Sequence, residues 1–88
     1  MLTNSITSQL MRIKNQYVSR MISKQRAKEL GEEALNTHYN RMIQMTRDDF
    51  RYRFRVNREP PKEKMKPLEQ KRKEAIRTWR FIINVLKP

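Results

Sequence analysis

Arginine and aromatic residues alternate from position 50 to position 55, and these residue types are well suited to contact RNA. Phe50, Tyr52 and Phe54 are separated by single arginines. A guanidinium group forms a planar fork that matches phosphate oxygens, and a flat ring can stack on an unpaired base. Lysines continue the basic character toward position 73. The predicted RNA-binding residues are Arg12, Lys14, Arg20, Lys24, Arg51, Arg53, Arg55, Arg58, Lys62, Lys64, Lys66, Lys71, Arg72 and Lys73.

The sequence offers little for catalysis or metal binding. It contains one His, one Gly and no Cys, which excludes a thiolate zinc site and a Gly-rich phosphate loop. The one imidazole, His38, lies beside Tyr39, and a lone His next to an apolar stripe more often has a structural or RNA-contacting role. Catalysis needs convergent polar groups in a cleft, which these scattered residues do not supply. We therefore predict no enzymatic activity, no metal, no cofactor and no small-molecule substrate.

The charge balance of the chain predicts an acidic partner. Its 88 residues include 21 Lys or Arg and 9 Asp or Glu, which gives a net charge of +12. Only 36% of the residues are hydrophobic, and a chain of this length buries a small core even at average composition. Self-repulsion opposes a compact free monomer, and binding to a polyanion removes that cost. We therefore predict that the chain has no independent globular core and depends on an RNA scaffold.

Residues 1–31 are predicted to form one basic amphipathic helix from about residue 4 to residue 30. Thr3 or Asn4 is expected to cap its start, and Gly31 is expected to end it. Its apolar stripe follows from spacings of three and four residues and consists of Ile6, Leu10, Ile13, Tyr17 and Met21.

The same segment has the composition of a mitochondrial transit sequence. It has no acidic residue before Glu29, and its Lys and Arg residues are mixed with Ser, Thr and apolar residues. The same composition fits equally well a basic surface helix of a nucleic-acid-binding protein. If the segment directs the chain to the mitochondrial matrix, the presence of Met1 predicts that it is not removed. No run of 18 apolar residues is present, so no membrane-spanning helix is expected.

Residues 32–58 are predicted to hold a second helix followed by the arginine–aromatic arm. Leu35, Tyr39 and Met42 form a helical stripe, and residues 46–49 resemble a capping box that would start a new turn. The alternation from 50 to 56 is a strand pattern, but the sequence offers no second strand to pair with it. Two solutions stay open, an extended arm lying on a partner and a helix through about Arg53 with an extended exit. We prefer the helix.

Residues 59–66 are predicted to be a Pro- and Lys-rich linker, and residues 67–88 a C-terminal amphipathic helix. Pro67 is suited to the first helical position. The apolar face that follows is expected to pack on the first two helices or to dock on another protein. The fold class is therefore all-α, with two to three helices and an extended basic linker. The predicted protein-docking residues are Tyr39, Trp79, Ile82, Ile83 and Leu86.

A short, Cys-free, basic helical chain with a Pro-interrupted arm resembles the small accessory proteins of mitochondrial ribosomes. Local likeness to one large-subunit family lies in Arg26-Ala27-Lys28, His38-Tyr39 and Met45-Thr46-Arg47. The resemblance implies a structural constituent of a ribosome whose partners are ribosomal RNA and neighbouring ribosomal proteins.

The alternative is a matrix-side accessory subunit or assembly factor of a respiratory-chain complex. Such a chain would bind a large protein or anionic lipid headgroups. Families of this kind often carry a Leu-Tyr-Arg signature near the N-terminus. Here Leu10-Met11-Arg12 and Arg51-Tyr52-Arg53 are approximations of it.

Overall fold

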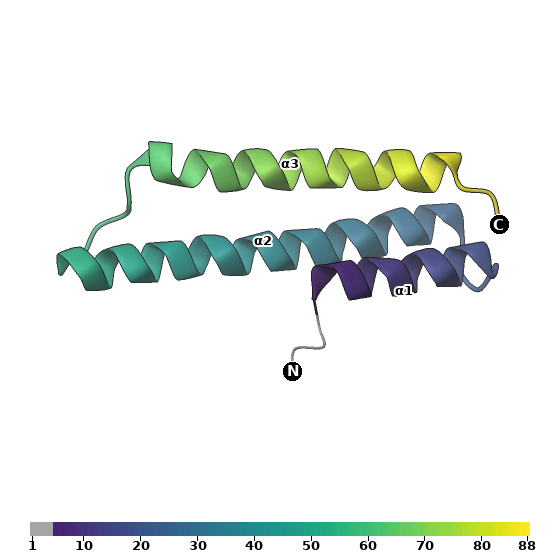
Figure 1. Cartoon of the computed structure of the whole chain (residues 1–88), viewed down its shortest axis with the longest axis horizontal. Helices are drawn as coiled ribbons and strands as arrows, with labels where there is room; N and C mark the ends of the chain where they lie inside the picture. Colours follow the sequence, from purple (N-terminus) through teal and green to yellow (C-terminus); the bar gives the residue numbers. More distant parts are fainter. Residues whose placement is uncertain (1–4) are drawn as a thin grey trace.

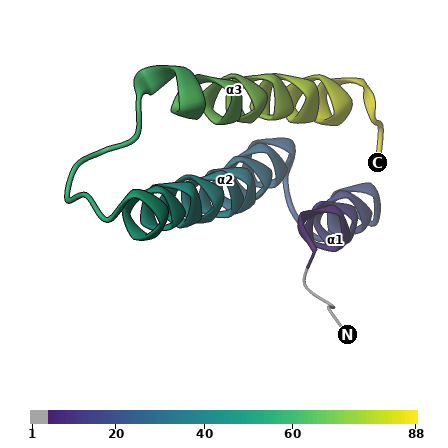
Figure 2. The ribbon, with the colours of Figure 1, turned by 60° about the vertical axis from the view of Figure 1, so that its left-hand side comes forward.

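The computed structural model describes residues 5–88, which form three helices and contain no strand. The helices are α1 (Ile6–Val18), α2 (Lys24–Phe54) and α3 (Lys62–Val85). Figure 1 shows α2 and α3 running antiparallel beside each other, with α1 alongside the N-terminal half of α2. The view in Figure 2 separates α1 and α3 onto different sides of α2. The prediction of an all-α fold is confirmed.

The predicted single helix over residues 4–30 is wrong, because the chain breaks after Val18. Arg20 adopts a left-handed backbone conformation with φ 62°, and Ser23 then caps α2 by accepting a hydrogen bond from the Arg26 N–H at 3.1 Å. A Ser hydroxyl competes with the helical backbone for hydrogen bonds, which favours a break where two serines flank a short segment. The predicted caps Thr3 and Asn4 lie outside the described residues, and Ser5 caps α1.

Gly31 does not end a helix, in contrast to the prediction, but lies buried inside α2. A methyl group at this position would overlap the indole ring of Trp79 on α3. Glycine therefore serves here to let two helices approach closely. Tertiary packing outweighs the low helix propensity of this residue.

The predicted restart of the helix at residues 46–49 is also wrong, because α2 runs through it without interruption. Thr46 instead donates its hydroxyl to the Met42 carbonyl at 2.9 Å, a local bond that an intact helix accommodates. The helix ends at Phe54, and Arg55 follows with φ 50°. The helical part of the preferred solution, a helix through about Arg53, is therefore confirmed. The predicted extended exit is wrong, because a left-handed turn at Arg55 and bends at Asn57 and Arg58 follow the helix.

The connection to α3 is shorter than the predicted linker, since the helix begins at Lys62 and contains Pro67 in its second turn. Proline lacks the N–H that a helix interior needs, which is why Pro67 was predicted at the first helical position. The burial of residues that precede the proline explains why α3 begins earlier than predicted. Met65 and Pro60 are both buried, which fixes the first turn of α3 against the end of α2.

The core joins all three helices at the end of the molecule where α1 lies. Its buried members are Tyr17, Ala27, Leu35, Trp79 and Ile83. Two side-chain hydrogen bonds to backbone carbonyls complete it, from Trp79 Nε1 to Ala27 at 3.1 Å and from Tyr17 Oη to Leu86 at 3.2 Å.

This core occupies part of the surface that the sequence assigned to docking on other proteins. Trp79 and Ile83 are 3% and 0% exposed within the chain itself, so packing on α1 and α2 replaces the predicted docking for these two residues. Tyr39 and Leu86 pack against the same core and are partly buried. Ile82 is half-buried, on the same helix.

Candidate nucleic-acid interface

The end of α2, the connection and the start of α3 form one basic end of the molecule, which we call the hairpin tip (residues 47–66). It carries eight Lys or Arg and four Asp or Glu. In Figure 1 it lies at the opposite end from the turn between α1 and α2. The whole arginine–aromatic run therefore lies at one end of the molecule, together with Lys62, Lys64 and Lys66.

Glu59 holds two arginines of α2 on one side of the tip. Its carboxylate oxygens lie 3.4 Å from Arg47 Nε and 3.5 Å from Arg51 Nη2. Both Nε atoms are buried and have no hydrogen-bond partner within the described residues. Arg47 and Glu59 border a hollow of about 740 Å³ that is also lined by Lys62 and Lys66. Arg47 was not among the predicted RNA-binding residues, although its spacing of four from Arg51 places both on one helix face.

The two phenylalanines of the tip are occupied by contacts within the chain. The rings of Phe50 and Phe54 lie 4.8 Å apart between centroids. The Lys64 ammonium group lies 5.7 Å from each ring, within the range of a cation–π interaction. Lys64 is thus positioned by this aromatic pair.

Tyr52 differs from both phenylalanines because its side chain is 85% exposed. It borders a depression of about 430 Å³ whose other lining residues are Arg51, Arg53 and Arg55. Arg53 is paired with Asp49 one turn earlier, at 3.1 Å, whereas Arg55 has no ion pair within the described chain. The tip can therefore offer a flat ring and a cationic group to the same ligand.

Several other cations of the tip are exposed and have no carboxylate partner among the described residues. Because most of these groups already lie in water, bringing them against phosphates costs little desolvation, and the release of condensed counterions drives the binding. They are Arg55, Arg58, Lys62 and Lys66.

The remaining predicted RNA-binding residues do not belong to the tip. Arg12, Lys14, Arg20 and Lys24 lie on α1, the turn after it and the first residue of α2. Helix α2 has 31 residues and is ~45 Å long, so these two basic groups occupy opposite ends of the molecule. A partner that contacts both would have to be large.

The last three predicted RNA-binding residues, Lys71, Arg72 and Lys73, lie on α3, and Arg72 has a structural role. Arg72 Nη1 donates a hydrogen bond to Asn40 Oδ1 on α2 at 3.1 Å. Lys71 and Lys73, on either side of it, are exposed. Only these two lysines of the predicted triplet are fully available to an external ligand.

A second bridge between α2 and α3 involves Glu32 and Arg80. Arg80 Nε and Nη2 donate to the two carboxylate oxygens of Glu32 at 2.7 and 2.8 Å. These hydrogen bonds lower the pKa of Glu32 below its ordinary value of 4.5, and they outweigh the opposing effect of partial burial. The pair therefore fixes the register of the two helices on their exposed side.

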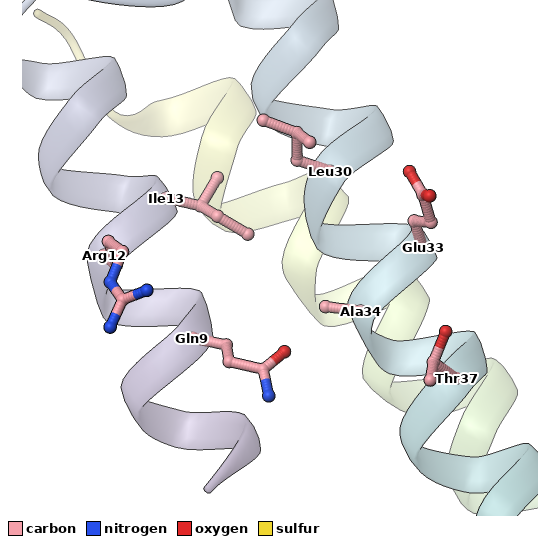
Figure 3. Close-up of a pocket in the computed structure, with 7 residues that line it drawn as sticks. All are labelled: Gln9, Arg12, Ile13, Leu30, Glu33, Ala34 and Thr37. Carbon is pink, nitrogen blue, oxygen red and sulfur yellow. The ribbon is translucent and has the colours of Figure 1, made fainter. Parts of the chain in front are cut away.

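Figure 3 shows the groove between α1 and α2, which has a volume of about 350 Å³. Its apolar part is formed by Ile13, Leu30 and Ala34, with the Arg12 guanidinium on α1 and the Glu33 carboxylate on α2 at its edges. No group of His, Cys, Asp or Glu suited to a metal ion occurs in residues 5–88. The groove offers apolar contact and one charge of each sign.

Comparison of the chain with protein-family models, with curated proteins and with solved structures finds no match. Within residues 5–88, none of the helices combines the length and the apolar character that crossing a membrane requires. The hairpin tip is therefore the feature on which a functional proposal can be based.

Proposed function

We propose that this chain is a structural, RNA-binding constituent of a ribosome. The observation that carries the proposal is the hairpin tip, where the exposed ring of Tyr52 lies beside three arginines, of which Arg55 has no carboxylate partner within residues 5–88. A surface of this kind suits a phosphate backbone with accessible bases better than it suits an acidic protein, because protein carboxylates offer no stacking partner.

The shape of the chain supports a large partner. The molecule measures 51 × 28 × 15 Å and carries basic groups at both ends of its long axis. Folded RNA presents phosphates over such distances, and a net charge of +12 is most favourably placed among them. A thin helical chain that spans two RNA segments would stabilise their arrangement.

We also propose that this ribosome is the mitochondrial one. The basic N-terminal segment has the composition of a transit sequence. Its apolar side chains Ile6, Leu10 and Ile13 pack against the core, so the segment contributes to the fold. A signal that is also part of the core would be retained in the mature protein.

The test is to express the tagged chain in mitochondria-containing cells and to measure its co-sedimentation with ribosomal particles. We expect co-sedimentation that is lost after RNase treatment or in high salt, since phosphate contacts are strongly salt-dependent. The triple variant Arg51→Gln, Arg53→Gln, Arg55→Gln should reduce incorporation severalfold. The control variant Arg41→Gln, Arg77→Gln, Lys87→Gln removes the same charge from exposed positions away from the tip and should incorporate nearly as the parent does.

The respiratory-complex alternative predicts a different distribution in the same experiment. An accessory subunit or assembly factor would survive RNase treatment and follow the membrane fraction. Incorporation of the tip variant at the parental level would also contradict the proposed role of the tip.

A further inference from the structure

We propose that Tyr52 stacks on an unpaired RNA base, so that the hairpin tip binds single-stranded or looped-out RNA in preference to a continuous duplex. This inference rests on the proposed RNA-binding function and specifies which form of RNA the tip recognises.

The first support is the contrast among the three aromatic residues of the tip. The rings of Phe50 and Phe54 contact each other at 4.8 Å with a tilt of 43°, and Lys64 lies over both, although Phe54 is still 57% exposed. Tyr52 takes part in no ring contact or hydrogen bond within the described chain, and 85% of its surface is exposed. Burying a large ring stabilises a fold, so a ring that is left in water contributes little to this one. Its free face is available to a ligand.

The second support is the position of the ring relative to cationic groups. The depression beside Tyr52 is lined by three arginines, of which Arg51 and Arg53 are held by carboxylates and Arg55 is not. A nucleotide whose base stacks on the ring would bring its phosphate near these guanidinium groups. Stacking combined with backbone neutralisation is the general way in which proteins bind single strands.

The third support is the rigidity of the position. Tyr52 lies in the last turn of α2, just before the left-handed residue Arg55. A side chain on a helix loses less conformational freedom on binding than one on a mobile loop. The helix therefore holds the backbone that carries this ring at the end of the molecule.

A continuous duplex could not use this ring. In A-form RNA the bases are stacked on each other, and a protein reaches mainly phosphates and 2′-hydroxyl groups. Duplex binding would therefore depend on the cations alone, whereas binding to an unpaired strand would depend on the cations and on Tyr52.

The experiment compares the affinity of the full chain for two labelled RNAs, an unstructured strand of about 12 nucleotides and a duplex of the same length, by fluorescence anisotropy. We expect Tyr52→Ala to weaken single-strand binding by about tenfold and duplex binding by less than twofold. Tyr52→Phe keeps the stacking face and should bind as the parent does. Phe81→Ala removes another exposed ring, 65% exposed on α3, and should leave both affinities unchanged. Circular dichroism confirms that each variant is folded.

The outcomes separate this inference from the function on which it rests. If the parent binds both RNAs and Tyr52→Ala changes neither affinity, or changes both equally, the stacking inference is overturned while RNA binding stands. If the parent chain binds neither RNA at moderate salt, the proposed function itself fails.

Discussion

At the residue scale, Gly31 shows how one position links two helices. It is buried in the N-terminal third of α2, and the indole of Trp79 occupies the space that a side chain would need. The same indole donates its N–H to the Ala27 carbonyl, so the ring is fixed by a hydrogen bond as well as by packing. The contact between α2 and α3 therefore requires a residue without a Cβ here.

Gly31→Ala should destabilise the chain by about 1–3 kcal/mol, because the added methyl forces the helices apart. Helix propensity alone predicts the opposite sign, a gain of about 1 kcal/mol. Urea unfolding followed by circular dichroism measures the difference. In a Trp79→Phe background the penalty should shrink, since the atoms that clash belong to the pyrrole half of the indole. A Gly31→Ala variant that is more stable than the parent in both backgrounds would refute this packing.

At the element scale, α2 and α3 are aligned by polar bridges outside the core. Arg72 reaches Asn40, and Arg80 reaches Glu32. The second bridge is charged and bidentate, a geometry that fixes orientation as well as distance. Protonation of the Glu32 carboxyl group would remove the charge on which this bridge depends.

The stability contributed by Glu32 should disappear in acid. Its pKa is lower in the folded chain than in the unfolded chain, so its contribution is present above the ordinary value of 4.5 and is lost as the pH falls through the folded value. The measurement is the difference in melting temperature between the parent and Glu32→Gln. We expect a modest difference at about pH 7, because the pair is partly exposed, and a smaller one at about pH 3, where more of the Glu32 carboxyl group is protonated in the folded chain. A difference of equal size at both pH values would show that the carboxylate charge is not the cause.

At the scale of the whole molecule, a small core is combined with a large excess of positive charge. Five buried side chains unite the three helices, while 21 basic residues face only 9 acidic ones. The cations at the two ends of the long axis repel each other little across ~45 Å, but those within each end repel strongly at low salt. Binding to a polyanion should therefore stabilise the folded chain, in addition to placing the chain on its RNA partner.

We expect the melting temperature of the free chain to rise by several degrees on addition of a folded RNA in low-salt buffer, since a ligand that binds the folded state stabilises it. Added salt should raise it by a smaller amount through screening. A neutral polymer at the same mass concentration serves as the control and should have little effect. A sharp melt of the monomer that RNA leaves unchanged would contradict dependence on a polyanion.

The sequence by itself determined the helical class and the chemistry of the tip. Apolar steps of three and four predicted helices, and the absence of a second strand candidate favoured helix over strand for the run around Tyr52. The residue types that can bind phosphates or stack on bases are also visible without a structure. These properties follow from local periodicity and side-chain chemistry, which the chain carries at every position.

Only the tertiary structure decided where the helices begin and end and which residues remain available. Gly31 continues a helix because Trp79, distant in sequence, packs on it, and α3 begins before Pro67 because Met65 is buried. Likewise, Phe50 and Phe54 pair with each other and leave Tyr52 exposed. Each of these outcomes depends on contacts between segments far apart in the chain or on the direction of side chains around a helix. Such contacts exist only once the helices are placed against one another, and their packing energy outweighs local propensity.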